Sequence, residues 1–268
     1  MSMKELSARY PTWLCDVWGV VHDGHRPIPH AVEALEQHRA AGGKVILITN
    51  APRPTATIRA FIDRMGVSRA AYDAMVTSGD VTRDLMRQLG GAGLYHLGPE
   101  LDLPLFEGLG VKRVPLAQAG AVVCTGLHDE TRETAEDYRP QLEAMKARAL
   151  TMICANPDKV VRKGTLLVPC AGAIAEIYEA IGGEVLMAGK PFAPIYDLAL
   201  QVAGSPPREK VLAIGDGPET DIKGAAAYGL SCVFISGGIN ESHDAEDEVR
   251  RLYPQAHIVK AMRELSWG

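Results

Sequence analysis

The sequence lacks the features that mark membrane, secreted and thiolate-metal proteins. It has no run of eighteen apolar residues, so it predicts no transmembrane helix. Residues 1–10 mix charged and apolar side chains, unlike a secretory signal peptide. The five cysteines are scattered and odd in number, and no two of them have the spacing of a metal site. These absences favour a cytoplasmic protein with reduced, mostly buried thiols.

A basic surplus and the common nucleotide-binding signatures are missing as well. The net charge is −5 and the isoelectric point is near 5.9, which implies no general attraction to nucleic acid or to an anionic membrane. No Walker loop, dinucleotide fingerprint or Ser-His-Asp spacing is present. The run Gly90-Gly91-Ala92-Gly93 has no basic residue after it and is typical of a linker. We therefore expect a small-molecule partner rather than a nucleic acid or a membrane.

The sequence does contain four short apolar runs that each end in a polar side chain. Such runs, bounded by turn residues, are typical of buried strands. In an open α/β sheet, ligands bind at the C-terminal edge of the strands. The four polar groups that end these runs would therefore meet at one edge: two carboxylates, a hydroxyl and an ammonium group. Such a set of side chains is suited to bind a cation and a phosphate group. The runs are Trp13–Cys15 before Asp16, Val45–Ile48 before Thr49, Val185–Gly189 before Lys190, and Val211–Gly215 before Asp216.

Strand-like and helix-like segments alternate along the chain, which predicts an α/β fold with a Rossmann-like parallel sheet. The 268 residues, 47% of them apolar, suffice for one large α/β domain or two modest ones. Glycine runs at 90–93 and 182–183 bracket a block with its own alternation. We predict a discontinuous core domain, 1–80 and 187–268, with an inserted α/β domain at 81–186. The expected strands are 45–48, 74–77, 94–97, 121–124, 150–155, 185–189, 211–214 and 232–235, and the expected helices are 29–41, 55–65, 80–89, 135–147, 171–181, 193–202 and 221–228.

Asp16 is the candidate nucleophile. A carboxylate at a strand end can attack phosphorus if the charge of the phosphate is offset. Backbone N–H groups in the following bend, at Trp18 and Gly19, could supply part of that offset. The alternative is a strand-terminal aspartate that caps a turn.

Asp216 and Asp221 form the candidate cation site. They lie five residues apart across a strand-to-helix turn, so both carboxylates can face one ion. Mg²⁺ prefers oxygen ligands and leaves room in its shell for water and substrate phosphate. For Asp221 the alternative is a helix N-terminal residue favoured by the helix dipole.

Lys190 and the segment after Val45–Ile48 are candidates for phosphate binding. A lysine fixed at a strand end can hold a phosphate as a point charge and stabilise the charge on Asp16. Thr49 offers a hydroxyl, and Asn50 and Ala51 offer backbone N–H groups. The alternatives are a surface lysine and an ordinary turn after a strand.

The order of these motifs resembles the haloacid dehalogenase (HAD) superfamily of phosphohydrolases. Its class IIA branch, with NagD-like and 4-nitrophenylphosphatase-like enzymes, carries a large α/β cap between the second and third motifs, where residues 81–186 fall. The resemblance covers nearly the whole chain. The motifs that carry it are Asp16, Ile48-Thr49-Asn50, Ala155-Asn156-Pro157-Asp158, Ala188-Gly189-Lys190-Pro191, and Ile214-Gly215-Asp216 with Thr220-Asp221-Ile222.

The resemblance implies a Mg²⁺-dependent phosphatase that works through an aspartyl-phosphate. Asp16, Thr49 and Lys190 would be catalytic. Asp16, the Trp18 carbonyl, Asp216 and Asp221 would hold Mg²⁺. The substrate would be a small phosphorylated metabolite: a sugar phosphate, a nucleotide monophosphate or an aryl phosphate. Asn156 and Asp158, after a cap strand, would face the substrate or else serve only as turn formers. A cap of this size also makes a homodimer possible.

One position departs from the family pattern. The family's phosphatases carry a second aspartate two residues after the nucleophile, as general acid/base, and here that residue is Trp18. Its carbonyl could still bind the metal, but its indole cannot transfer the proton. Loss of such help typically costs about 10²–10⁴-fold in rate. Another group would have to activate the water, and His22, His25 and Asp23 are the candidates. For the two histidines the alternative is a surface position in a hairpin.

Two other functions compete with the phosphatase prediction. The first is a catalytically weak or inactive phosphoryl-ligand binding or regulatory protein, which would have kept the cation site and lost turnover through Trp18. The second is C–halogen cleavage at the same aspartate. The pair Asp216 and Asp221 argues against this second alternative, because a haloacid substrate needs no cation.

Overall fold

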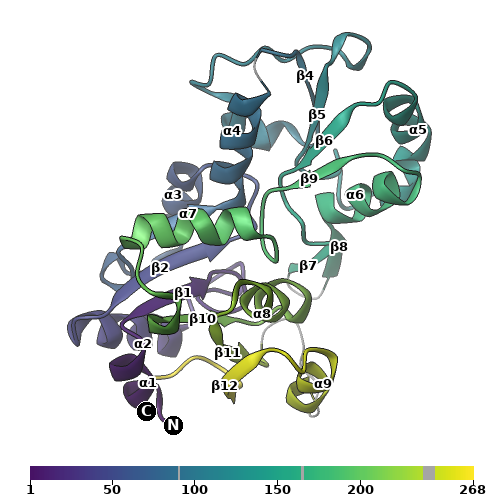
Figure 1. Cartoon of the computed structure of the whole chain (residues 1–268). Coiled ribbons are helices and arrows are strands. Elements are labelled where there is room, and N and C mark those ends of the chain that lie inside the picture. The colour runs from purple at the N-terminus through teal and green to yellow at the C-terminus, as the bar shows by residue number, and fades with distance from the viewer. Residues whose placement is uncertain (90, 164–165, 238–244) are drawn as a thin grey trace. The chain divides into compact units, whose positions relative to one another are not determined.

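The computed structural model describes residues 1–89, 91–163, 166–237 and 245–268. The chain divides into two compact units. The core unit comprises residues 1–49, 59–76 and 190–268, and the middle unit comprises residues 50–58 and 77–189. Each unit has its own sheet (Figure 1).

The core unit is built on a six-stranded sheet whose strand order is β12-β11-β10-β1-β2-β3. Strand β1 is fully buried, which explains its run of apolar residues, and it pairs in parallel with β10 and β2. The outer pairs β10–β11 and β11–β12 are parallel too. This confirms the predicted Rossmann-like parallel sheet. The strands are β1 (Thr12–Asp16), β2 (Lys44–Thr49), β3 (Ala74–Thr77), β10 (Val211–Gly215), β11 (Ser231–Ile235) and β12 (His257–Met262).

Helices connect these strands. Helix α2 begins at Pro29, whose fixed φ suits the first turn, and the chain leaves it through Gly42 at a positive φ. Helix α1 is not among the predicted helices; it begins with a capping box between Ser2 and Glu5. The helices are α1 (Met3–Arg9), α2 (Pro29–Ala40), α3 (Thr55–Met65), α7 (Ala193–Ala203), α8 (Lys223–Tyr228) and α9 (Ala245–Leu252); a π-helical turn, Pro218–Ile222, precedes α8.

The middle unit has a four-stranded parallel sheet of order β4-β5-β6-β9. One apolar cluster joins one face of this sheet to α4, and a second joins the other face to α5 and α6. A separate antiparallel hairpin, β7–β8, completes the unit. The elements are α4 (Ser78–Gln88), β4 (Leu94–Leu97), β5 (Ala121–Cys124), α5 (Arg139–Ala147), β6 (Thr151–Cys154), β7 (Val160–Lys163), β8 (Leu166–Pro169), α6 (Ala171–Ala180) and β9 (Val185–Met187).

Strand β9 corrects one expectation. The run Val185–Gly189 was expected at the edge of the same sheet as Asp16, but β9 pairs with β6 in the middle unit. A short apolar run shows that a strand is buried but does not identify its neighbour. Lys190 belongs to the core unit all the same.

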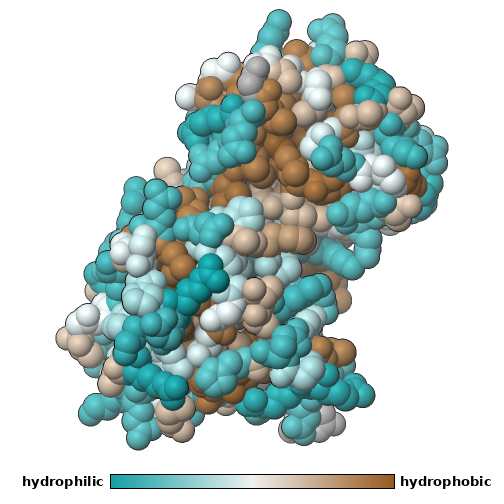
Figure 2. Space-filling view, in the orientation of Figure 1, coloured by the Kyte–Doolittle hydropathy of each residue, from teal (hydrophilic) through white to brown (hydrophobic). Residues whose placement is uncertain are grey.

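The cysteines are buried, and the exposed apolar side chains include several in the middle unit. All five cysteines are buried and none is in a disulfide, as predicted. Within the described ranges, no helix is both long and apolar enough to cross a membrane. Figure 2 shows apolar residues gathered on the visible face of the middle unit. Exposed large apolar side chains of that unit include Leu101, Leu166 and Leu167.

Candidate active site

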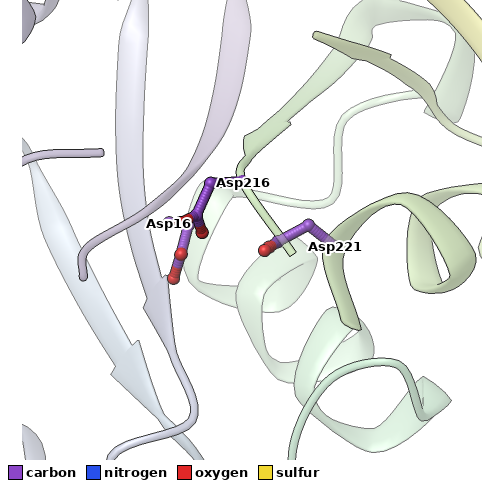
Figure 3. Close-up of side chains that lie close together, drawn as sticks. All are labelled: Asp16, Asp216 and Asp221. Carbon is purple, nitrogen blue, oxygen red and sulfur yellow. The ribbon is translucent and has the colours of Figure 1, made fainter. Parts of the chain in front are cut away.

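Three buried aspartates converge at the C-terminal end of the core sheet (Figure 3). Asp16 ends β1 and Asp216 follows β10. Because Cys15 is in register with Ile214 on the neighbouring strand, the two strand ends bring these carboxylates together. Asp221 comes from the π-helical turn. One carboxylate oxygen from each residue lies within 4.8 Å of the other two. The structure thus brings together the acidic residues that the sequence predicted for a cation site.

Two glycines make room for this cluster. A Cβ atom on Gly19, whose φ is +82°, would lie 2.2 Å from Oδ2 of Asp216. A Cβ atom on Gly215 would lie 2.1 Å from Cγ of Asp221. Both distances are far below any real contact, so each carboxyl group packs directly against backbone. Only glycine permits this at either position.

Lys190 is the cation of the cluster and is 2% exposed. Its Nζ donates to Oδ1 of Asp16 at 2.6 Å and to Oδ1 of Asp221 at 2.8 Å. Burial alone lowers the pKa of Lys190, but the two carboxylates outweigh it and raise that pKa well above the usual range. Burial and the charge of Asp16 raise the pKa of Asp221 to about 6, and Lys190 offsets part of the effect.

The donor set fits a divalent cation. Three carboxylates and one ammonium group leave two formal negative charges, which one divalent ion would neutralise. Mg²⁺ binds oxygen at about 2.1 Å, so opposite ligands lie about 4.2 Å apart, a separation below the 4.8 Å within which all three oxygens lie. Oδ2 of Asp221 accepts from the Gly217 N–H at 3.1 Å, so both Asp221 oxygens have protein donors. Asp221 is therefore better suited to hold an ion through water than directly.

The predicted phosphate-binding residues fall into two groups. Thr49 is buried at the end of β2, where the preceding Ile48 is in register with Asp16. Asn50 and Ala51 belong by contacts to the middle unit. The N–H of Gly19 donates to the carbonyl of the nearby His22 at 2.8 Å, so it already has a partner within its own bend. That bond counts against Gly19 as a phosphate donor.

Asn50 is held by residues of the middle unit. Its Nδ2 donates to Oδ1 of Asp158 at 2.8 Å, and the Ser78 hydroxyl donates to its carbonyl at 3.2 Å. Asn156 accepts the Asp158 N–H at 3.0 Å and so shapes the same turn. Asn156 and Asp158 were predicted either to face the substrate or to serve only as turn formers. These contacts show the turn-forming role, and a role toward substrate stays a prediction. Ser78 and the Asn50–Asp158 bond were missed, since spacing along the chain does not indicate them.

The residues suggested as substitutes for the missing acid/base have other partners. Nδ1 of His22 accepts from the Gly24 N–H at 3.0 Å, and the ring lies edge-on to Trp18. Burial lowers the pKa of His22 to about 4, so it is neutral near pH 7. Asp23 accepts from the backbone N–H groups of His25 and of the residue after it, each at 2.9 Å, and His25 is exposed. These contacts describe a hairpin turn.

Comparison with known proteins places the chain in a family. A protein-family model described as haloacid dehalogenase-like hydrolase matches residues 13–112, and a second family model, described as HAD-hydrolase-like, matches residues 187–265. A solved hydrolase of the haloacid dehalogenase-like family from Brucella suis 1330 is 43% identical, with 97% of both chains covered and a TM-score of 0.88. The chain belongs to the haloacid dehalogenase-like hydrolases. This confirms the family predicted from the motifs.

The relatives of this HAD hydrolase include class IIA phosphohydrolases. A D-glycerol 3-phosphate phosphatase from Mycobacterium tuberculosis is 27% identical over 98% of this chain and 73% of its own length. The ribonucleotide monophosphatase NagD of Escherichia coli (strain K12) is 26% identical over 87% of this chain and 90% of its own. The 4-nitrophenylphosphatase of Thermotoga maritima, at 22% identity over 98% of this chain and 97% of its own with a TM-score of 0.78, shows the shared fold. The predicted class IIA HAD phosphohydrolase is thereby confirmed.

Proposed function

We propose that this HAD hydrolase is a Mg²⁺-dependent phosphatase that hydrolyses a small phosphorylated metabolite through an aspartyl-phosphate on Asp16. The observation that carries the proposal is the buried cluster of Asp16, Asp216, Asp221 and Lys190 at one strand edge. The relatives are named as phosphatases of glycerol 3-phosphate and of ribonucleotide monophosphates. A glycerol phosphate phosphatase from Mycobacterium tuberculosis has been solved in complex with magnesium. These support a small phosphate ester as substrate, and we propose a sugar phosphate, a nucleotide monophosphate or an aryl phosphate.

Asp16 would supply the nucleophile. Its carboxylate oxygen would form a bond to phosphorus as the ester P–O bond breaks and the alcohol leaves; water would then release phosphate and regenerate Asp16. The ammonium group of Lys190 lies 2.6 Å from that carboxylate and would hold it in place. A divalent cation, when bound, would offset the charge of the phosphate. Asp16, Asp216 and the Trp18 carbonyl would hold it, with Asp221 acting through water.

The phosphoryl group would be positioned by Thr49, Asn50, Ala51 and Lys190, with the Trp18 N–H in the bend after Asp16. We propose that residues 81–186 act as a cap that excludes bulk water during the reaction. A cytoplasmic location and a homodimer stay predictions.

Trp18 favours a second candidate, a phosphoryl-ligand binding protein with little or no turnover. The indole cannot transfer a proton, and His22 is neutral and held within its turn. If this candidate is correct, the cation and phosphate sites persist while hydrolysis of the aspartyl-phosphate is slow.

One panel of assays separates the two. Hydrolysis of phosphomonoesters, including an aryl phosphate, is measured with Mg²⁺ and with chelator for wild type, Asp16→Asn and Trp18→Asp. Asp84→Asn, at an exposed surface pair with Arg87, is the matched control. Turnover that needs Mg²⁺ and vanishes only in Asp16→Asn supports the phosphatase. If wild type binds Mg²⁺ and phosphate without turnover, and Trp18→Asp gains activity, the binding protein is favoured.

A further inference from the structure

The middle unit contains a pocket of about 480 Å³ that shares no residue with the aspartate cluster. That volume lies within the range of small-molecule sites. The pocket is formed by the two middle residues of the edge strand β4, by the loop after β4, by residues 113–115 beside it and by one residue after β5. Its lining includes Tyr95, His96, Glu100, Arg113 and His128.

Arg113 gives the pocket a cation that no carboxylate of the described residues contacts as an ion pair. Its guanidinium lies over the Phe106 ring, 5.8 Å from the centroid. Across the described ranges, its side chain forms no ion pair. A guanidinium that is held by an aromatic ring and lacks a carboxylate can offer its paired N–H donors to a phosphate or carboxylate. Arg113 therefore indicates an anionic ligand.

Strand β4 adds main-chain groups. The N–H and carbonyl of Leu94 bond outward, to Lys112 and Val114, while the carbonyl of Leu97 bonds inward to Thr125 beyond β5. Because successive residues of a parallel strand bond to opposite sides, the N–H and carbonyl of His96 point outward from the sheet edge. No described strand pairs with β4 on that side. The pocket thus gains one donor and one acceptor of fixed direction.

The walls of the pocket are fixed before any ligand binds. Nε2 of His96 is 2.9 Å from the Thr125 hydroxyl, and Nδ1 of His128 is 2.9 Å from the carbonyl of Gly98. The His128 N–H donates to the Tyr138 hydroxyl at 2.8 Å. Preformed walls reduce the entropy that binding costs. His128 bonds a carbonyl through Nδ1, which leaves its Nε2 for another partner.

Glu100 restricts the class of ligand. It is an exposed carboxylate of the same lining and, like Arg113, has no ion pair with any described residue. A ligand that is anionic throughout would meet repulsion from it. A ligand with an anionic group for Arg113 and a hydroxyl or ammonium group for Glu100 would satisfy both.

We propose that this pocket is a second ligand site, for a small metabolite that carries one oxyanion group, phosphate or carboxylate, beside a hydroxyl or ammonium group. Arg113 and the His96 N–H bind the oxyanion, and Glu100 accepts from the donor group. The site does not depend on the phosphatase reaction, since every residue in it comes from the middle unit.

The test follows backbone amide signals by NMR in the full chain, with chelator present so that turnover plays no part. The probes are glycerol 3-phosphate, glycerate and neutral glycerol, which share hydroxyl groups and differ in the anion. We expect saturable shifts at the amides of His96 and Arg113 with one or both anions and none with glycerol. Which anion binds more tightly identifies phosphate or carboxylate as the preferred group.

Three variants sharpen the test. Arg113→Ala should weaken binding about tenfold or more, through loss of charge-assisted hydrogen bonds. Lys112→Ala removes a neighbouring cation that does not line the pocket. The affinity of this variant for the anion should stay within about twofold of wild type. Glu100→Gln should weaken binding of the hydroxylated anions less than Arg113→Ala does. The proposal is overturned if neither anion shifts these amides, or if Arg113→Ala binds as tightly as Lys112→Ala.

Discussion

Gly19→Ala tests the geometry of the aspartate cluster most directly. The new methyl group would lie 2.2 Å from Oδ2 of Asp216, whereas ordinary contact begins at 3.4 Å, so one of the two must move by about 1.2 Å. Metal sites tolerate errors of only about 0.2 Å in ligand distance. A misplacement of about 1 Å near reacting groups can cost about 100-fold in rate. We expect Gly19→Ala to lower Mg²⁺ affinity and kcat/KM by about that factor.

The same substitution carries a backbone cost that must be separated from the effect on Asp216. At a φ of +82° an alanine costs about 1–2 kcal/mol relative to glycine. Gly42→Ala is the matched control: its φ is +88°, and nothing lies within 4 Å of the added methyl. Both variants should therefore lose similar stability from the backbone alone, and only Gly19→Ala should lose metal affinity.

The assay combines calorimetric Mg²⁺ titration, thermal unfolding and steady-state kinetics on the best ester of the panel. If Gly19→Ala binds Mg²⁺ and turns over as Gly42→Ala does, the close packing of Asp216 against the Gly19 backbone is irrelevant to the site. If both variants lose Mg²⁺ affinity equally, the effect is backbone strain and the steric argument is refuted.

Three further predictions address other contacts. Lys190→Met should lower the melting temperature of the metal-free protein sharply, because losing one partner of a buried ion pair costs about 3–5 kcal/mol. Addition of Mg²⁺ should raise the melting temperature of this variant more than that of wild type. His38 is buried and its pKa is lowered to about 4, chiefly by burial, so its contribution to stability is complete above pH 6.5 and is lost as pH falls toward 4. His38→Phe should therefore lose less stability than wild type between pH 7 and pH 4.5 in unfolding titrations, by up to about 3 kcal/mol, while the exposed control His30→Gln should follow wild type. Asp158→Ala should raise KM for phosphate esters more than it changes kcat, because it removes the acceptor that fixes Asn50; an unchanged KM would contradict a positioning role.

At Trp18 the chain departs from the family pattern, because an indole stands where the family's phosphatases carry the acid/base aspartate. The bend that carries it is well packed: a Cβ atom on Gly24 would lie 2.7 Å from the indole ring, and His22 lies edge-on to that ring at 5.1 Å. An aspartate here would leave space beside Gly24 and His22. Trp18→Asp therefore tests both catalysis and packing, and unfolding curves of the variant separate the two.

The sequence determined the strand ends that carry the candidate cation site and the chemistry of its side chains. Apolar runs ending in Asp16 and Asp216 predicted two strand ends, and the rule that parallel strands end at one sheet edge predicted that their side chains meet. Asp221 followed from its place after the turn. The local pattern was enough for these three aspartates because each lies at a strand end or in the turn after one, and parallel strands end at the same edge of the sheet.

Only the tertiary structure decided which elements pair and which side chains are already engaged. The apolar pattern of Val185–Met187 is that of any buried strand, so its membership of the middle sheet depended on the packing of residues distant in sequence. The Asn50–Asp158 bond joins residues 108 positions apart, and the pocket at β4 depends on the pairing of Leu94 with the segment around Arg113. The lack of side-chain space at Gly19 and Gly215 is likewise set by carboxylates that reach them from elsewhere in the fold. Local propensity acts over a few residues, whereas register, burial and steric room are properties of the assembled chain.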